Sequence, residues 1–239
     1  MKTNNLLYFG FILIVWHASV LHACEIDLLK DSRQQVISIV SDKNTYKSSV
    51  YLVENGKVLK KFRGVIGRNG ISKNKREGDG KSPSGIFPLS FGFGSSSKVA
   101  SKNFPFTTVT ENSHCIDDIN HPKYNKILFD YKKPSHISSE NLKKVGAPYE
   151  FAVAVDYNHL DPNSKTNPVK SYGSCIFLHV WKQKSKKEIG PTAGCTAYSR
   201  ENMIETLNWL DKSKNPVLIQ LTRAEYQKQN RSHCFPKNL

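Results

Sequence analysis

The sequence lacks several features that would assign it to a common functional class. It has no Cys-x-x-Cys pair, and Cys115 with His121 has no familiar zinc spacing, so we expect no structural metal site. It has no internal repeat, no sign of a second domain, and no segment after the N-terminus long and apolar enough to span a membrane. Acidic residues are scarce, with 20 Asp and Glu against 35 Lys and Arg, which gives a formal net charge of +15.

The first 23 residues are typical of a secretory signal. Lys2 supplies the positive charge, and Leu6–Trp16 is an unbroken apolar stretch of eleven positions, too short to cross a bilayer comfortably. We expect cleavage just before Cys24, and therefore an exported protein of the periplasm or cell envelope. The four residues that end at Cys24 also resemble a bacterial lipoprotein box, although His22 is unusual there, so a lipid anchor on Cys24 is a second prediction.

The positive charge indicates anionic partners. For an exported protein these would be cell-envelope polymers or phospholipid head groups. The lysines are scattered and form no recognised nucleic-acid-binding motif, so nucleic acid is not an expected partner. A merely solvated basic surface is the alternative.

The chain is 38% hydrophobic and 23% charged, which is a globular composition with enough apolar residues for a sizeable core. Many short alternating segments and few helical ones predict a mainly β domain, sandwich or barrel-like. We expect four parts: a signal peptide at 1–23, a short N-terminal segment at 24–34, the main folded domain at 35–222, and a polar, peripheral C-terminal tail at 223–239.

Local signals place the main elements. Asn55-Gly56 lies between two alternating runs and predicts a tight hairpin turn. Residues 67–86 are rich in Gly, Lys and Ser, so they predict a loop or broad hairpin tip. A helix is predicted over Ser199–Asp211, with Ser199 near its start and apolar residues at helical spacing. Further strands are expected at 106–110, 151–155, 176–179 and 216–221.

Cys195 is a candidate nucleophile. Gly194 permits a close backbone approach, and the cysteine sits just before the predicted helix, where backbone amides lower a thiol's pKa and face a developing oxyanion. The preceding loop suggests an exposed thiol. The alternative is a small buried hydrophobic side chain, which is what most free cysteines are.

His179 is a candidate general base at the end of a predicted strand. Alternation sends Ile176 and Leu178 to one face, and Phe177 and His179 to the other. A histidine at a strand end can meet a thiol distant in sequence, take its proton and return a proton to a leaving amine. A hydrogen-bonded structural histidine is the alternative, and His159, in a turn, competes as the base.

These residues form blocks that resemble the L,D-transpeptidase (YkuD-domain) family. GSCIFLH at 173–179 is followed by TAGCTA at 192–197, with Cys195 sixteen positions after His179. EGDGKSPSGIF at 77–87 is similar to a hairpin of one branch of that family, as are CIDD at 115–118 with Tyr124-Asn125, and Asp156-Tyr157-Asn158. The resemblance covers roughly residues 35–222.

The resemblance implies an L,D-transpeptidase-like β-sandwich with few short helices and no cofactor. It implies that Cys195 attacks the diaminopimelate carbonyl of a peptidoglycan stem peptide, expels a terminal D-amino acid and passes the acyl group to an amine, giving 3→3 or related links. His179 would be the base, oriented by the Val180 carbonyl, and the amides of Gly194 and Cys195 would form the oxyanion hole.

The sequence indicates the substrate-binding residues less clearly than it indicates the nucleophile and the base. Trp181, just beyond the base, is a candidate cleft wall, and Thr196 and Asn158 are candidate substrate-binding residues. Asp118 and Asn125 could also contact substrate, or could serve local backbone groups. The lysine-rich run 182–187 would overhang the site, either attracting carboxylates or forming a solvated loop.

The sequence departs from the commoner family form near the base and near the nucleophile, where Thr196 and Ala197 replace the Arg or Asn that soon follows the cysteine. Ala193 stands where a histidine precedes Gly-Cys, and Val180 stands where a glycine follows the base, which leaves acceptor preference open. An L,D-carboxypeptidase or amide hydrolase with the same Cys–His site is one alternative function. A non-catalytic cell-wall-binding envelope protein is another. A papain-like protease fits less well, because its nucleophile precedes its histidine.

Overall fold

The computed structural model describes residues 26–42, 45–96, 103–183, 185, 188–229, 235–236 and 239. The expected signal peptide, Cys24 and Cys234 lie outside these residues. None of the helices in this described part is both long and apolar enough to cross a membrane.

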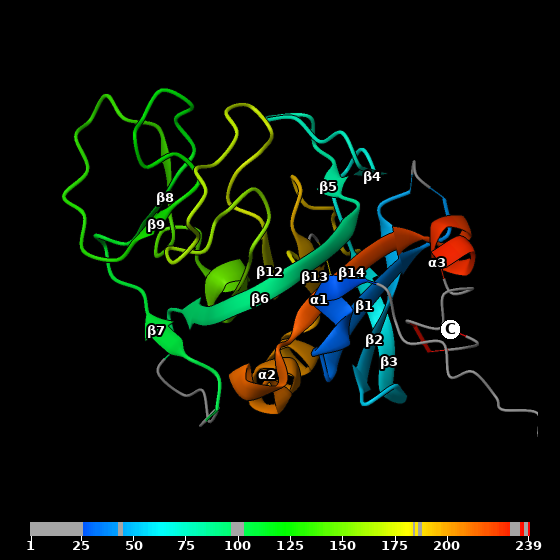
Figure 1. The fold of residues 1–239 in the computed structure, drawn as a ribbon. Helices are drawn as coiled ribbons and strands as arrows, with labels where there is room; N and C mark the ends of the chain where they lie inside the picture. Colours follow the sequence, from blue (N-terminus) through cyan, green and yellow to red (C-terminus); the bar gives the residue numbers. More distant parts are fainter. Residues whose placement is uncertain are drawn as a thin grey trace, which may run out of the picture.

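A nine-stranded sheet forms the body of the molecule (Figure 1), and the expectation of a mainly β fold with few helices is confirmed. Strand β11 pairs with both β12 and β6, so the sheet curls and closes on itself through eight of its strands. In sheet order the strands are β11 (Ala152–Val155), β12 (Phe177–Val180), β13 (Thr196–Tyr198), β3 (Lys57–Val65), β2 (Lys47–Glu54), β1 (Gln34–Val40), β14 (Val217–Thr222), β6 (Gly85–Gly94) and β7 (Phe106–Thr108).

Two smaller sheets lie on either side of the site described below. One has the order β10 (Ser139–Asn141), β8 (His114–Ile116), β9 (Ile127–Leu128), and the other pairs β4 (Ile71–Ser72) with β5 (Ser82–Pro83). Figure 1 shows β8 and β9 at one side of the molecule, and β4 and β5 above the main sheet.

The predicted hairpin is present. Strands β2 and β3 pair antiparallel, and the turn between them has Asn55 and Gly56 both at positive φ, 48° and 75°. This is the left-handed conformation that Asn-Gly adopts at low cost, which explains why the local sequence was sufficient to predict it.

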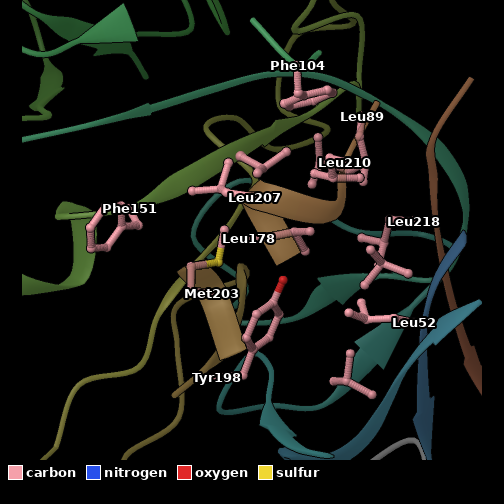
Figure 2. Close-up of a cluster of buried hydrophobic side chains, with 14 of the residues drawn as sticks. Leu52, Leu89, Phe104, Phe151, Leu178, Tyr198, Met203, Leu207, Leu210 and Leu218 are labelled. Carbon is pink, nitrogen blue, oxygen red and sulfur yellow. The ribbon is translucent and has the colours of Figure 1, made fainter. Parts of the chain in front are cut away.

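The predicted helix is α2 (Arg200–Trp209), with 3₁₀ turns at Ala147–Tyr149 and Lys212–Lys214 elsewhere. The Ser199 side chain accepts a hydrogen bond from the Asn202 amide, which caps the first turn. Met203, Leu207 and Leu210 are almost fully buried against the inner face of the sheet, including Leu178 of β12. Figure 2 shows these side chains meeting in one cluster.

The C-terminal segment differs from the expected peripheral tail. Residues Arg223–Gln229 form helix α3, while α1 (Asp27–Lys30) is a single turn at the other end of the described chain. Tyr226 and Phe235 are buried, stack with ring centroids 5.1 Å apart, and pack on β1 and β14. The segment is polar in composition, but these two aromatic side chains are enough to attach it to the core.

Candidate active site

The turn that carries Cys195 is fixed by side-chain hydrogen bonds. The Thr192 hydroxyl accepts from the Gly194 amide at 3.1 Å and donates to the Cys195 carbonyl at 2.6 Å. A second hydroxyl, from Ser82, donates to the Gly194 carbonyl at 2.5 Å. The nucleophile candidate therefore sits on a backbone that is held from both sides before β13 begins.

Ser82 connects this turn to the segment predicted as a loop. It is fully buried in β5, and its oxygen also accepts from the Gly67 amide at 2.9 Å. Gly67 has to be a glycine, because a Cβ there would lie 2.4 Å from the Gly80 carbonyl oxygen. The Gly-rich stretch is thus a scaffold for the Cys195 turn, a role that local composition does not show.

The Cys195 thiol is buried rather than exposed, with 8% of the residue accessible. Its sulfur accepts from the Phe177 amide and donates to the Cys175 carbonyl, each at 3.4 Å. Burial raises the pKa of the thiol to about 12, and the negative Glu140 adds to this effect. The hydrogen bond from the Phe177 amide and the positive charge of Lys75 lower the pKa, but by less than burial raises it. The expectation of a lowered thiol pKa is therefore wrong for this state, because desolvation outweighs the nearby donors.

His179 lies on β12, with its ring packed edge-on against Tyr149 at 5.3 Å between centroids. Its Nδ1 lies 2.8 Å from the Val180 carbonyl oxygen. A carbonyl only accepts, so Nδ1 carries the hydrogen and Nε2 of the neutral ring keeps its lone pair. Burial lowers the pKa of His179 to about 4. The contact expected with Val180 is present, and it leaves the imidazole as a base.

The sheet brings the two residues to one face. Strands β12 and β13 are parallel, with Leu178 opposite Thr196 and His179 opposite Ala197. Ile176, Leu178 and Val180 join the cluster under α2, whereas Phe177 joins Cys195 in the cluster on the other face. Both Cys195 and His179 line one cavity of about 330 Å³. In this state the thiol bonds to backbone groups of Cys175 and Phe177, and no hydrogen bond among the described residues joins it to the imidazole.

A disulfide forms part of the same wall. Cys115 on β8 is bonded to Cys175, with the Cα atoms 6.0 Å apart. Cys175 has a positive φ of 55°, and its carbonyl is the one that accepts from the Cys195 thiol. The Asn125 side chain accepts from the Cys175 amide at 2.9 Å. The cysteine pairing, which the sequence left open, thus connects the three-stranded sheet to the candidate nucleophile Cys195.

Charged residues of both signs line the cavity. Tyr149 lines the cavity and donates to Glu140 at 2.9 Å. Lys75 is almost fully buried and pairs with Asp79 at 2.9 Å. The charged lining residues are Arg68, Lys75, Lys182, Glu77, Asp117 and Glu140. No group of three or more potential metal ligands occurs in the part of the chain that the structure describes.

The remaining sequence-predicted residues lie at different places. Gly194 lines the cavity, but its amide already bonds to Thr192. Thr196 is buried and donates to the Gln220 side chain. Trp181 lines a separate cavity of about 460 Å³, beyond the strand that carries His179.

Asn158 has its side chain bonded to the backbone of Val169 and Gly173. It is not among the residues that line the cavity of Cys195. The residues that sequence reasoning missed are Ser82, Thr192, Lys75, Glu140 and Tyr149. Of these, only Ser82 and Thr192 stood inside quoted motifs, so the blocks themselves were the available signal.

Comparison with known proteins adds a family match. A family model described as the L,D-transpeptidase catalytic domain (YkuD) matches residues 37–219. Among the curated proteins no match was found.

Solved structures that match include two forms of the helical cell shape determining protein Pgp2 from Campylobacter jejuni. One is 19% identical with a TM-score of 0.37, over 78% of this chain and 46% of that chain. The K307A mutant is 18% identical, also at 0.37, over 80% and 47%. The C442S mutant of Enterococcus faecium L,D-transpeptidase is 11% identical with a TM-score of 0.35, over 80% and 50%. This chain spans about half the length of these structures.

Proposed function

Because this chain belongs to the L,D-transpeptidase catalytic domain family, we propose that it is an exported cysteine transpeptidase acting on peptidoglycan stem peptides. The observation that carries the proposal is the placement of Cys195 and His179 on one face, lining one cavity, within the matched region. The cavity is large enough for a few residues of a peptide, and it bears charges of both signs for a substrate with carboxylates and ammonium groups.

The first half of the reaction forms a thioester. The thiol exchanges its hydrogen bond to the Cys175 carbonyl for one to Nε2 of His179, which takes the proton as the sulfur attacks the peptide carbonyl carbon. The Cys195 amide is the donor best placed to meet the oxyanion, since the Gly194 amide is bonded to Thr192. The C–N bond then breaks, and the imidazolium returns the proton to the departing D-amino acid.

The second half transfers the acyl group. An amine of another stem attacks the thioester, loses a proton to His179, and regenerates the thiol as the new amide forms. Water in place of the amine would give the hydrolase outcome with the same residues. We propose the transpeptidase because the acyl thioester forms in a cavity where only 8% of the Cys195 residue is accessible, which limits water.

The proposal places the protein in the cell envelope, where peptidoglycan lies. It includes the leader at 1–23, with Cys24 as the first mature residue and as a site that lipid could modify. Asn158 and Thr196 enter as positioning residues, because their side chains hold the loop before β12 and the strand after Cys195. Trp181 takes no part in the proposed reaction, because it lines the separate cavity and not the cavity of Cys195 and His179.

The test is incubation of the purified protein with a disaccharide tetrapeptide. Intact mass spectrometry should show an acyl adduct on Cys195, and product analysis should show released D-amino acid together with cross-linked dimers. Cys195→Ala should abolish both signals while it keeps the fold. His179→Gln should lower turnover by about 100-fold or more, the range for a general base.

His159→Gln is the matched control, because His159 was the competing base and contacts Ser164 on a turn. It should leave turnover near the wild-type value. If the wild-type protein forms no adduct with any stem peptide, the proposed enzymatic activity is wrong. Release of D-amino acid without dimers, at every acceptor concentration, would replace the transpeptidase with a carboxypeptidase.

A further inference from the structure

Two carboxylates, one on the three-stranded sheet (β10, β8 and β9) and one on the residue that follows β8, line the cavity of Cys195. Asp117 directly follows β8, and Glu140 is the central residue of β10, opposite Cys115 in the strand register. Both line the cavity together with His179. Because β8 and β10 are adjacent strands, the two acids share one wall, and that wall belongs to the cavity of the nucleophile rather than to the outer surface.

One oxygen of Asp117 has no partner. Its Oδ1 atom is buried from solvent and accepts no hydrogen bond from any of the described residues. A buried, unpaired carboxylate oxygen is costly, since it has lost water without gaining a donor. Such an atom in the wall of a cavity indicates a donor that arrives with a ligand.

The carboxyl of Glu140 is also affected by burial and by a neighbouring negative charge. It accepts a hydrogen bond from Tyr149 at 2.9 Å, and the burial of its carboxyl raises its pKa, as does the negative charge of Asp117. Two carboxylates on one wall repel each other, and a cation between them would relieve both the repulsion and the desolvation.

The cations of the cavity come from other elements. Lys75 is committed to Asp79 and to the Arg76 carbonyl. Arg68 follows β3 and bonds through its amide to Thr192, and Lys182 follows β12. The remaining acid of the cavity, Glu77, accepts from Tyr124 and Ser174. No positively charged side chain among the described residues forms an ion pair with Asp117 or Glu140, so these two acids form a negative part of the cavity wall.

The position of this wall relative to the sulfur is fixed. The disulfide joins Cys115, two residues before Asp117, to Cys175, whose carbonyl contacts the Cys195 thiol. Tyr149 joins Glu140 to the ring of His179. A group held by the two carboxylates would thus be held at a set distance from the reacting atoms.

We propose that Asp117 and Glu140 form a subsite for a primary ammonium on the side chain of the donor residue whose carbonyl Cys195 attacks. This inference rests on the proposed function and deepens it, because it assigns the selection of an ammonium-bearing stem peptide to these two residues. A donor without the charge would leave Asp117 Oδ1 buried without a partner and the two like charges uncompensated, and a site with an unpaired buried polar group rejects an analogue strongly.

The experiment compares two tetrapeptide donors that differ only at one group. One carries diaminopimelate at its third position, and the other carries the same residue with its side-chain amine acetylated. The variants are Asp117→Asn and Glu140→Gln, with Glu111→Gln as the matched control. Glu111 is an exposed acid just before β8 that lies outside the cavity. Melting curves confirm that each variant is folded.

The readout is kcat/KM for D-amino acid release. With the free amine, Asp117→Asn and Glu140→Gln should each lose about 10- to 100-fold, the worth of a hydrogen bond to a charged group. With the acetylated donor they should stay within about twofold of wild type. Glu111→Gln should change neither. Equal losses on both donors, or no loss on either, would overturn the inference.

A binding arm separates this inference from the reaction itself. Calorimetry with Cys195→Ala measures the affinity for each donor without turnover. Preference for the free amine that Asp117→Asn removes supports the subsite even if the wild-type protein releases no D-amino acid, which would refute only the proposed function. Wild-type turnover of both donors at the same rate refutes only the subsite.

Discussion

The thiol of Cys195 donates its hydrogen to the backbone carbonyl of Cys175 across 3.4 Å. The Cys175 side chain is itself bonded to Cys115, so Cys195 is held by a residue that is covalently fixed to a neighbouring sheet. Stability and reactivity are therefore connected at this point.

Removal of the disulfide should weaken both. The Cys115→Ala/Cys175→Ala variant frees a loop of sequence separation 60, and we expect the free energy of unfolding to fall by about 2–4 kcal/mol. The Cys175 carbonyl would also lose its fixed position, so thioester formation should slow. Urea unfolding and intact mass spectrometry measure the two effects. Unchanged thioester formation in a destabilised variant would show that the bridge serves stability alone.

Ser82→Ala should destabilise the Cys195 turn. The hydroxyl accepts from Gly67 and donates to Gly194 while fully buried, so its loss leaves two backbone groups unpaired at a cost of about 1–3 kcal/mol. Turnover should fall as well. Ser84→Ala, which removes a half-buried contact to Glu225, is the control and should cost less than about 1 kcal/mol. The comparison fails if both variants behave alike.

The free energy of unfolding at acidic pH should depend on the protonation of His179. Its pKa is lowered from 6.5 to about 4 in the folded protein. Between these values the unfolded chain binds the proton and the folded chain does not, so the free energy of unfolding should fall as pH drops from 6.5 to 4. The loss is about 3 kcal/mol at most. Urea unfolding at several pH values should show this slope, and His179→Gln should flatten it while His159→Gln does not.

At alkaline pH the free energy of unfolding should depend on Cys195, and there it should fall as the pH rises. The pKa of this thiol is raised from 9.0 to about 12, so the unfolded thiol ionises first as pH rises. The free energy of unfolding should therefore decrease between pH 9 and pH 12. Cys195→Ala removes this contribution, and a slope that persists unchanged in that variant would assign it to other groups.

The resting pair should be neutral. A thiol with a raised pKa beside an imidazole with a lowered one does not form an ion pair, so alkylation of Cys195 by iodoacetamide at pH 7 should be at least about tenfold slower than that of a small free thiol. Peptide mass mapping isolates Cys195 from Cys24 and Cys234. Fast alkylation that is flat from pH 6 to 8 would instead indicate a thiolate already present.

The sequence was most informative where one strand or one turn decides the outcome. Alternation along β12 placed Phe177 and His179 on the face opposite Leu178, and the clusters follow that division. The Asn55-Gly56 turn and the Ser199 cap depend only on neighbouring residues. The pairing of β6 with β11, which closes the sheet, joins segments about sixty residues apart that carry no signal for each other.

The parts of the site that could not be predicted are those that depend on distant contacts. Thiol burial reversed the expected direction of the Cys195 pKa because Phe177, Tyr149 and Cys175 cover it. Glu140 stands in none of the recognised sequence blocks, and the pairing of β10 with β8 brings it to the cavity. A side chain's surroundings are set by the fold, so local composition cannot supply them.

The parallel pairing of β12 with β13 separates two parts of the chain. One part holds His179 and Cys195 at fixed positions, and the other is the segment between the strands, which can vary in length. His179 and Cys195 are held by the ladder that pairs Leu178 with Thr196, whatever the length of chain between the two strands. That intervening chain leaves the ladder after Val180 and returns at the Thr192 turn, and its Lys182 and Pro191 border the cavity. We expect insertions or deletions between Gln183 and Ile189 to alter the border of the cavity at Lys182 and Pro191 and to leave the pairing of β12 with β13 unchanged.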